Sequence, residues 1–164
     1  MPEDQLSAWA DRYADPSEAE IEKVIAPSVR ARGHLRRNEF LELCRWKTAR
    51  TQRRCRANSE ELVGEVTRTA LGTRHEELKI RVLLLLEGVS WPTASVILHF
   101  CDQERYPILD VRALWSVGLQ RVPTYTFSLW WSYTCFIRKI SDRTGLSMRS
   151  IDRALWQYSK ERQR

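Results

Sequence analysis

Glycine and proline are scarce in this sequence, and its cysteines lack the spacing of a metal site. Six glycines and six prolines among 164 residues are too few for the many turns of an all-β protein. The four cysteines (Cys44, Cys55, Cys101 and Cys135) are at least eleven positions apart and form no C-x-x-C, which excludes the common zinc and iron–sulfur patterns. We therefore expect no metal, no other cofactor, and reduced thiols among apolar neighbours.

Long apolar segments are missing as well. The longest stretch without a charged residue, Val122 to Ile137, contains Pro123 and several hydroxyl residues and is shorter than a membrane span. Its pattern is typical of a buried helix preceded by an approach loop. The N-terminus is acidic and has no apolar signal segment, so we expect a cytoplasmic, nucleoid-associated protein without membrane contacts.

Helical periodicity and aromatic residues are what the sequence has in quantity. With 43% hydrophobic residues and seven tryptophans, the chain can bury a sizeable core, and we expect one all-α domain over residues 1–164. The apolar run Val82 to Leu86 predicts a helix at the centre of the protein. The helices expected are about 16–26, about 36–49, 60–72 after the cap Asn58-Ser59-Glu60-Glu61, one from the capping box Thr73-Arg74-His75-Glu76 to residue 86, and about 92–101, 110–118, 128–142 and 148–160.

Charge is strongly segregated along the chain. The net charge is +6. The segment from Arg45 to Arg56 carries six basic residues and no acidic one, whereas the first 27 residues carry seven acidic and two basic residues. Such segregation indicates one face for a polyanion and another for solvent. The alternative interpretation of the basic segment is a solvated loop.

A tight turn between two helices is the most informative motif. Gly88 can take the positive φ of a reversal between helices, and Pro92 suits the first turn of the helix that follows. Such a hairpin directs main-chain N–H groups, supported by a helix dipole, at an anion such as a phosphate. We expect this helix-hairpin-helix element at about residues 74–101.

The hairpin, with Asp110 eighteen residues after Pro92, resembles the helix-hairpin-helix DNA glycosylase superfamily, whose signature is matched by Gly88, Val89, Thr93 and Ala94. The resemblance covers roughly residues 74 to 120 and implies a two-lobed helical architecture with Asp110 as the catalytic acid. Ser90 replaces the second hairpin glycine, and Pro92 replaces the lysine of the glycosylase-lyases. Because proline cannot form a Schiff base, the resemblance implies a monofunctional enzyme of base excision repair. The cysteine spacing indicates that this enzyme has no iron–sulfur cluster.

The residues expected to carry function fall into three groups. Asp110 is the candidate catalytic residue. The candidate contacts to the DNA backbone are Gly88, Ser90, Thr93, Arg50, Arg53 and Arg54. Trp46, Lys47 and Trp91 are candidates for the wall of a pocket that receives a flipped base. We expect DNA as the partner of a monomeric protein.

Three other hypotheses stay open at this point. Asp110 can serve only as a helix cap or pair with Arg112, which would leave a DNA-binding module without catalysis. The turn Arg143 to Ser147 between two helices is also typical of a helix-turn-helix regulator, whose recognition helix would present Arg149, Ser150, Arg153 and Gln157. The plainest hypothesis is a helical interaction protein in which the hairpin is only a turn.

Overall fold

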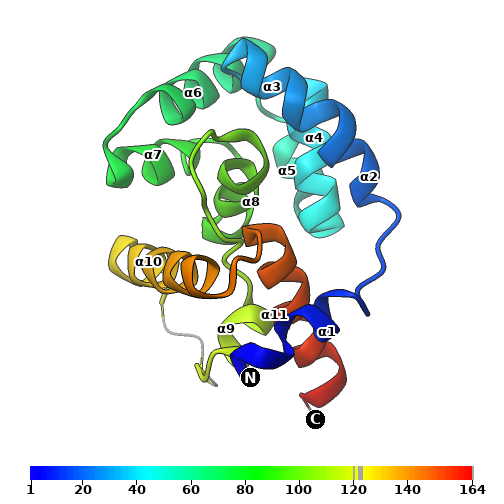
Figure 1. Cartoon of the computed structure of the whole chain (residues 1–164). Coiled ribbons are helices and arrows are strands. Elements are labelled where there is room, and N and C mark those ends of the chain that lie inside the picture. Colours follow the sequence, from blue (N-terminus) through cyan, green and yellow to red (C-terminus); the bar gives the residue numbers. More distant parts are fainter. Residues whose placement is uncertain (120, 122–123, 164) are drawn as a thin grey trace. The chain divides into compact units, whose positions relative to one another are not determined.

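The computed structural model describes residues 1–119, 121 and 124–163, and all regular structure in this part of the chain is helical (Figure 1). The prediction of an all-α fold is confirmed. The chain divides into two compact units: unit 1 comprises Met1–Asp15 and Arg105–Arg164, and unit 2 comprises Pro16–Glu104. Of the predicted approach loop, Val122 and Pro123 lie outside the described residues. None of the helices described combines the length and apolar character needed to cross a membrane.

Unit 2 contains nine helical segments in sequence order. They are α2 (Glu18–Glu20), the π-helix η2 (Ile21–Ile25), α3 (Ala26–Arg32), α4 (Arg37–Lys47), the 3-10 helix η3 (Ala49–Thr51), α5 (Gln52–Cys55), α6 (Glu60–Gly72), α7 (Glu76–Leu83) and α8 (Trp91–Cys101). The first three run on without a break, so the expected helix 16–26 extends to residue 32, where Gly33 ends it in the left-handed conformation with φ +82°.

The helix caps of unit 2 agree only in part with the sequence pattern. Ser59 caps α6 by accepting a hydrogen bond from the amide of Leu62 at 3.1 Å, as the pattern predicts. The predicted capping box at the start of α7 is wrong. His75 is the N-cap residue there, and its Nδ1 accepts from the amide of Leu78 at 3.2 Å, while Thr73 accepts from the amide of His75.

Helix α8 is the most deeply buried element of unit 2. It packs against α3, α4 and α7, and eight of its eleven residues are buried. The stretch before it does not follow the prediction of uniform burial, because Leu85 is 69% exposed whereas Leu83 and Leu86 are buried. The α7–α8 hairpin therefore has one helix in the core and a turn that reaches the surface.

Unit 1 is organised around its last helix. Its elements are η1 (Glu3–Gln5), α1 (Leu6–Ala10), α9 (Val111–Ser116), α10 (Phe127–Thr144) and α11 (Met148–Arg162), and α11 packs against α1, α9 and α10. The first two elements were not expected from the sequence. Asp110, Thr126 and Ser147 cap the three later helices through their side chains, and Gly145 ends α10 with φ +72°.

A buried ion pair joins the two helices of the hairpin at the end away from the turn. Lys79 Nζ of α7 lies 2.6 Å from Asp102 Oδ2 just beyond α8, and the two side chains are 5% and 3% exposed. Asp102 also accepts from the amide of Glu104 at 2.8 Å. Removing one partner would leave a buried charge without compensation, which costs far more than the pair itself contributes.

We expect Asp102→Asn to lower the free energy of unfolding by about 3–5 kcal/mol, because it leaves the Lys79 ammonium buried without a counter-charge. The double variant Lys79→Met/Asp102→Leu should lose much less, since it buries no charge. Urea denaturation of the full chain measures both. Equal losses in the two variants would contradict this account.

Candidate nucleic-acid interface

The α7–α8 hairpin makes its reversal in the residues after Leu83. The main chain turns through Leu84 to Gly88, where φ is +82°, and Val89 N donates to Leu86 O at 3.1 Å. Ser90 is the N-cap residue of α8, with extended backbone and no hydrogen bond from its side chain to the helix. The predicted hairpin and the positive φ at Gly88 are confirmed.

Gly88 sits directly on helix α5. A Cβ atom at this position would lie 2.6 Å from Cys55 Sγ, 2.8 Å from the main-chain nitrogen of Cys55 and 3.1 Å from Thr51 O. Side chains are therefore excluded here twice, by the positive φ and by the close approach of the α5 backbone. The contact places the basic segment beneath the turn of the hairpin.

A buried asparagine fixes the turn from the other side of α5. Asn58, 2% exposed, donates through Nδ2 to Glu87 O at 2.9 Å and to Cys55 O at 2.9 Å, and its Oδ1 accepts from Glu87 N at 2.8 Å. The side chain thus pairs with the Glu87 main chain as a neighbouring strand would. The sequence pattern indicated a helix cap at Asn58 and missed this role.

The start of α8 has amides that the protein does not use. In the part of the chain described, the main-chain N–H groups of Gly88, Ser90, Trp91 and Thr93 have no hydrogen-bond acceptor, but Gly88 and Thr93 are buried, so only those of the exposed Ser90 and the half-buried Trp91 can meet a ligand. The first turn of α8 also contains no acidic residue, whereas α6 and α7 have two each. Thr93 is 1% exposed, so neither its amide nor its hydroxyl is accessible, and the DNA contact predicted for it is wrong. The dipole of α8 and these amides favour an anion at this helix end.

The three arginines predicted to contact DNA lie on the elements under the hairpin. Arg50 belongs to η3, Arg53 and Arg54 belong to α5, and all three side chains are exposed. Arg54 Nη2 lies 3.2 Å from Glu87 Oε2, and the side chains of Arg54 and Glu87 are 71% and 59% exposed. The structure therefore brings predicted arginines and hairpin together, with one carboxylate of the hairpin among them.

The three residues predicted to form the wall of a base pocket do not lie together on one element. Trp46 packs edge-on against Phe100 of α8, with ring centroids 5.3 Å apart, and is half-buried. Lys47 is the half-buried last residue of α4. Trp91 is half-buried at the start of α8 with the Arg81 guanidinium 6.0 Å from its ring centroid. These contacts are structural, and nothing in them alone makes a base pocket.

Asp110, the predicted catalytic residue, lies in unit 1. Its Oδ1 accepts from Arg112 N at 2.9 Å, so the carboxylate caps α9. Burial and then the charge of Asp110 raise the pKa of Tyr125, and burial, Asp152 and Asp110 raise that of Tyr133. The charge of the half-buried Asp110 therefore contributes to the raised pKa of both tyrosines.

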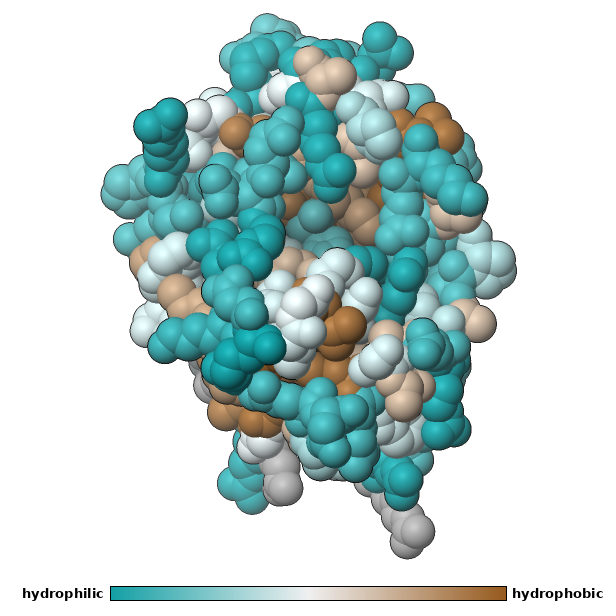
Figure 2. Space-filling view, viewed as in Figure 1, coloured by the Kyte–Doolittle hydropathy of each residue, from teal (hydrophilic) through white to brown (hydrophobic). Residues whose placement is uncertain are grey.

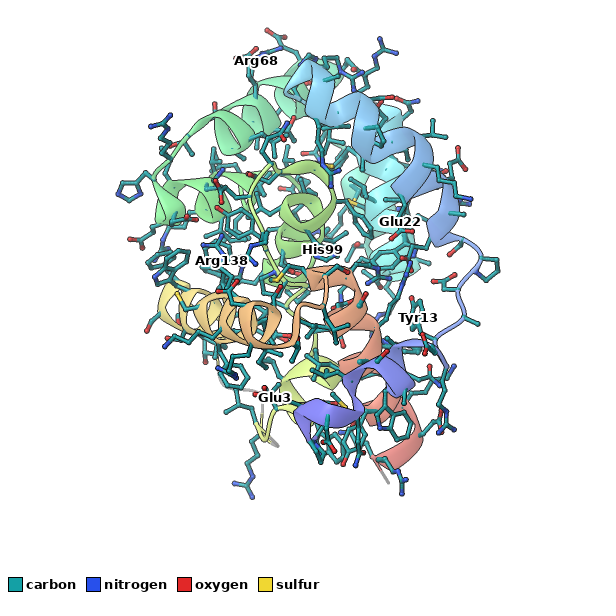
Figure 3. All side chains as sticks on the ribbon, viewed as in Figure 1. Glu3, Tyr13, Glu22, Arg68, His99 and Arg138 are labelled. Atoms are coloured by element: carbon teal, nitrogen blue, oxygen red, sulfur yellow. The ribbon has the colours of Figure 1, made fainter. Side chains whose placement is uncertain are left out.

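An aromatic cluster on α10 was not found from the sequence. Tyr106 stacks on Trp130 with centroids 5.5 Å apart. The guanidinium of Arg138, which is labelled on α10 in Figure 3, lies 4.9 Å from the Tyr106 centroid. On the same unit, two hollows of about 190 and 210 Å³ share Val117 and Phe136 in their walls, and Asp110 lines neither. The view in Figure 2 shows mainly hydrophilic side chains, with apolar ones in small patches.

The face of α11 does not suit a recognition helix. Arg149 forms an ion pair with Asp152, its guanidinium lies 5.3 Å from the ring centroid of Tyr13, and Gln157 is 8% exposed. Polar side chains that would have to read base edges are therefore engaged within unit 1. These contacts count against the helix-turn-helix hypothesis.

Neither the search for a metal site nor the comparison with known proteins indicates a function. Among the described residues, no three His, Cys, Asp or Glu side chains gather as they would around a metal ion. Comparison with family models, with curated proteins and with solved structures finds no match to this chain. Function therefore has to be argued from the hairpin and its surroundings.

Two glycines with the same φ allow the contact between Gly88 and α5 to be tested. We expect Gly33→Ala to lower the free energy of unfolding by about 1 kcal/mol, the cost of a positive φ alone, because nothing lies within 4 Å of its Cβ position. Gly88→Ala has the same φ of +82° but meets α5, so we expect a loss of about 3 kcal/mol. Thermal or urea unfolding measures the difference, and equal losses would mean that α5 gives way without cost.

Proposed function

We propose that the protein binds the DNA backbone through the α7–α8 hairpin and hydrolyses the N-glycosidic bond of a modified base, as a DNA glycosylase without lyase activity. The observation that carries the proposal is the turn at Gly88. It leads into α8, where the exposed Ser90 and the half-buried Trp91 have main-chain amides without acceptors in the described part of the chain, and it rests on the helix that bears exposed arginines.

Phosphate is the ligand that this chemistry favours. Amides at a helix N-terminus bind an anion through hydrogen bonds and the helix dipole, without reading base sequence. Arg50 and Arg53 are exposed and form no ion pair among the described residues, so both are available to neighbouring phosphates. Binding of this kind is independent of sequence and weakens steeply with salt.

Asp110 is the residue we assign to chemistry. When a glycosidic bond breaks, positive charge develops on the deoxyribose, and a carboxylate close to the sugar stabilises that charge and orients the attacking water. The cap bond from Arg112 N to Oδ1 fixes the position of the carboxylate, and this role is compatible with catalysis. Pro92 stands where a lyase would need an amine, so the proposed reaction ends at the abasic site.

A DNA-binding module without catalysis is the second candidate. It is favoured by the fact that the Asp110 side chain already has a structural task as the cap of α9. Both candidates need the hairpin, and only the enzyme needs a carboxylate at position 110.

Replacing Glu87 by glutamine should strengthen DNA binding. The change removes a carboxylate from the hairpin and releases Arg54, so we expect the Kd for a duplex to fall about threefold at low salt and the slope of log K against log salt to steepen by about one. Fluorescence anisotropy at several salt concentrations measures both values. Glu65→Gln is the matched control, because it breaks an exposed pair with Arg68 on α6 with the same change of net charge. An equal effect of the two variants would show that only net charge matters.

The catalytic proposal is tested with duplexes that carry 8-oxoguanine, uracil, hypoxanthine or alkylated purines, followed by alkaline cleavage of abasic sites. We expect the full chain to act on at least one of them and Asp110→Asn to lose at least about a hundredfold in rate. Asparagine can still accept the bond from Arg112 N, so folding and duplex affinity should be retained. Asp142→Asn, at an exposed aspartate paired with Arg105 in the same unit, is the control and should keep full activity. DNA binding without cleavage of any lesion would leave the binding module as the function.

A further inference from the structure

Two cations share one tryptophan ring on unit 1. Where α9 and α11 pack against each other (Figure 1), the guanidinium of Arg112 lies 5.6 Å from the ring centroid of Trp156, and the ammonium of Lys160 lies 5.0 Å from the same ring. Tyr13 meets this ring edge-on, with centroids 5.5 Å apart. Arg112 and Trp156 are half-buried and Lys160 is exposed, so the ring holds both cations at the surface of the unit.

We propose that Arg112 and Lys160, positioned by Trp156, form a binding site for the phosphates of a DNA strand. This inference rests on the proposed function for the identity of its ligand. It adds a second contact to the DNA backbone, on the unit that carries Asp110, and all of its residues belong to unit 1, whereas the hairpin belongs to unit 2.

The protein leaves the two charges without compensation. Among the described residues, Arg112 and Lys160 form no ion pair and their side chains donate no hydrogen bond. A ring attracts a cation through its quadrupole but has no net charge, so it fixes the cation and leaves its charge to act on an anion. Elsewhere in unit 1 arginines are held by carboxylates, in the pairs Arg12–Glu161, Arg105–Asp142, Arg143–Glu3 and Arg149–Asp152.

Phosphate suits the two side chains. The guanidinium of Arg112 presents N–H donors in a planar fork that matches two phosphate oxygens, and the ammonium of Lys160 adds a compact charge with three donors. Contacts with the Trp156 ring restrict both long side chains before a ligand arrives, so less conformational entropy is lost when a phosphate binds.

The main chain links this site to the proposed catalytic carboxylate. Asp110 Oδ1 accepts a hydrogen bond from the amide of Arg112 at 2.9 Å, so the residue that would hold a phosphate also fixes the carboxylate. Phosphate and sugar alternate along a DNA strand. A strand anchored at Arg112 therefore passes close to Asp110, where the proposed reaction needs a sugar.

The experiment measures duplex binding of the full chain by fluorescence anisotropy at several salt concentrations. Arg112→Gln/Lys160→Gln removes both charges but keeps the apolar stems that cover the ring. Arg105→Gln/Arg143→Gln is the matched control, because it removes two exposed charges of the same unit that already pair with carboxylates. Urea unfolding checks each fold, and Lys160→Gln alone, at an exposed side chain, carries the test if Arg112→Gln unfolds the protein.

A third variant separates this site from the hairpin. Ser90→Asp gives α8 the side-chain acceptor that it lacks and adds a negative charge there, so it opposes a phosphate at the hairpin while favouring the helix. It leaves unit 1 unchanged.

We expect Arg112→Gln/Lys160→Gln to raise the Kd for a duplex about tenfold at low salt and to lower the slope of log K against log salt by at least about one. Lys160→Gln alone should account for about threefold of this loss, and the matched control should change the Kd less than about twofold. Equal losses in the two double variants would overturn the site and leave this face to a partner with acidic side chains.

The hairpin variant distinguishes the possible failures. A loss of affinity in Ser90→Asp but not in Arg112→Gln/Lys160→Gln would overturn the site and retain the proposed function, and the reverse result would retain the site without the hairpin. If the unchanged protein binds no duplex, the proposed function fails, and a titration with inorganic pyrophosphate decides the site. The indole N–H resonance of Trp156, assigned with Trp156→Phe, must then shift in the unchanged protein and stay in place in the double variant.

Discussion

The contact between Gly88 and helix α5 is the constraint on which the candidate interface depends. It ties a turn with positive φ to a short helix of arginines, and Asn58 completes the attachment by pairing with the main chain of Glu87. Neither element is long enough to hold its own geometry, since a helix of four residues is unstable in isolation. The contact between them orders both.

Electrostatics and hydrogen bonding favour the same ligand at this place. The start of α8 lacks the acidic residues that neutralise the starts of α6 and α7, and the arginines beside it are exposed. Ser59 supplies an acceptor at the start of α6 and His75 at the start of α7, whereas α8 begins without a side-chain cap, as α1, α2 and α5 do. The amides at the start of α8 are therefore left to water or to a ligand, and the helix dipole favours an anion over a neutral group there.

Local signals in the sequence predicted local structure well. The helix class, the turn at Gly88, the cap at Asp110 and the turn from Arg143 to Ser147 between two helices all depend on residues within a few positions of one another. The clamp from Asn58 to Glu87 spans 29 residues, and the approach of Gly88 to Cys55 depends on how the turn packs on α5. Neither has a periodicity or spacing that sequence reasoning can use. The burial of Leu85 was predicted wrongly for a related reason, because an apolar run carries no mark of where a helix ends and a surface turn begins.

Asp110 shows why a structural task does not argue against a catalytic one. A carboxylate that accepts a main-chain N–H has its ionised form stabilised and its position fixed, and a group that must face developing positive charge needs both properties. Its charge also acts on its surroundings, since it contributes to the raised pKa of Tyr125 and of Tyr133. Those phenols therefore stay protonated near neutral pH and can donate hydrogen bonds.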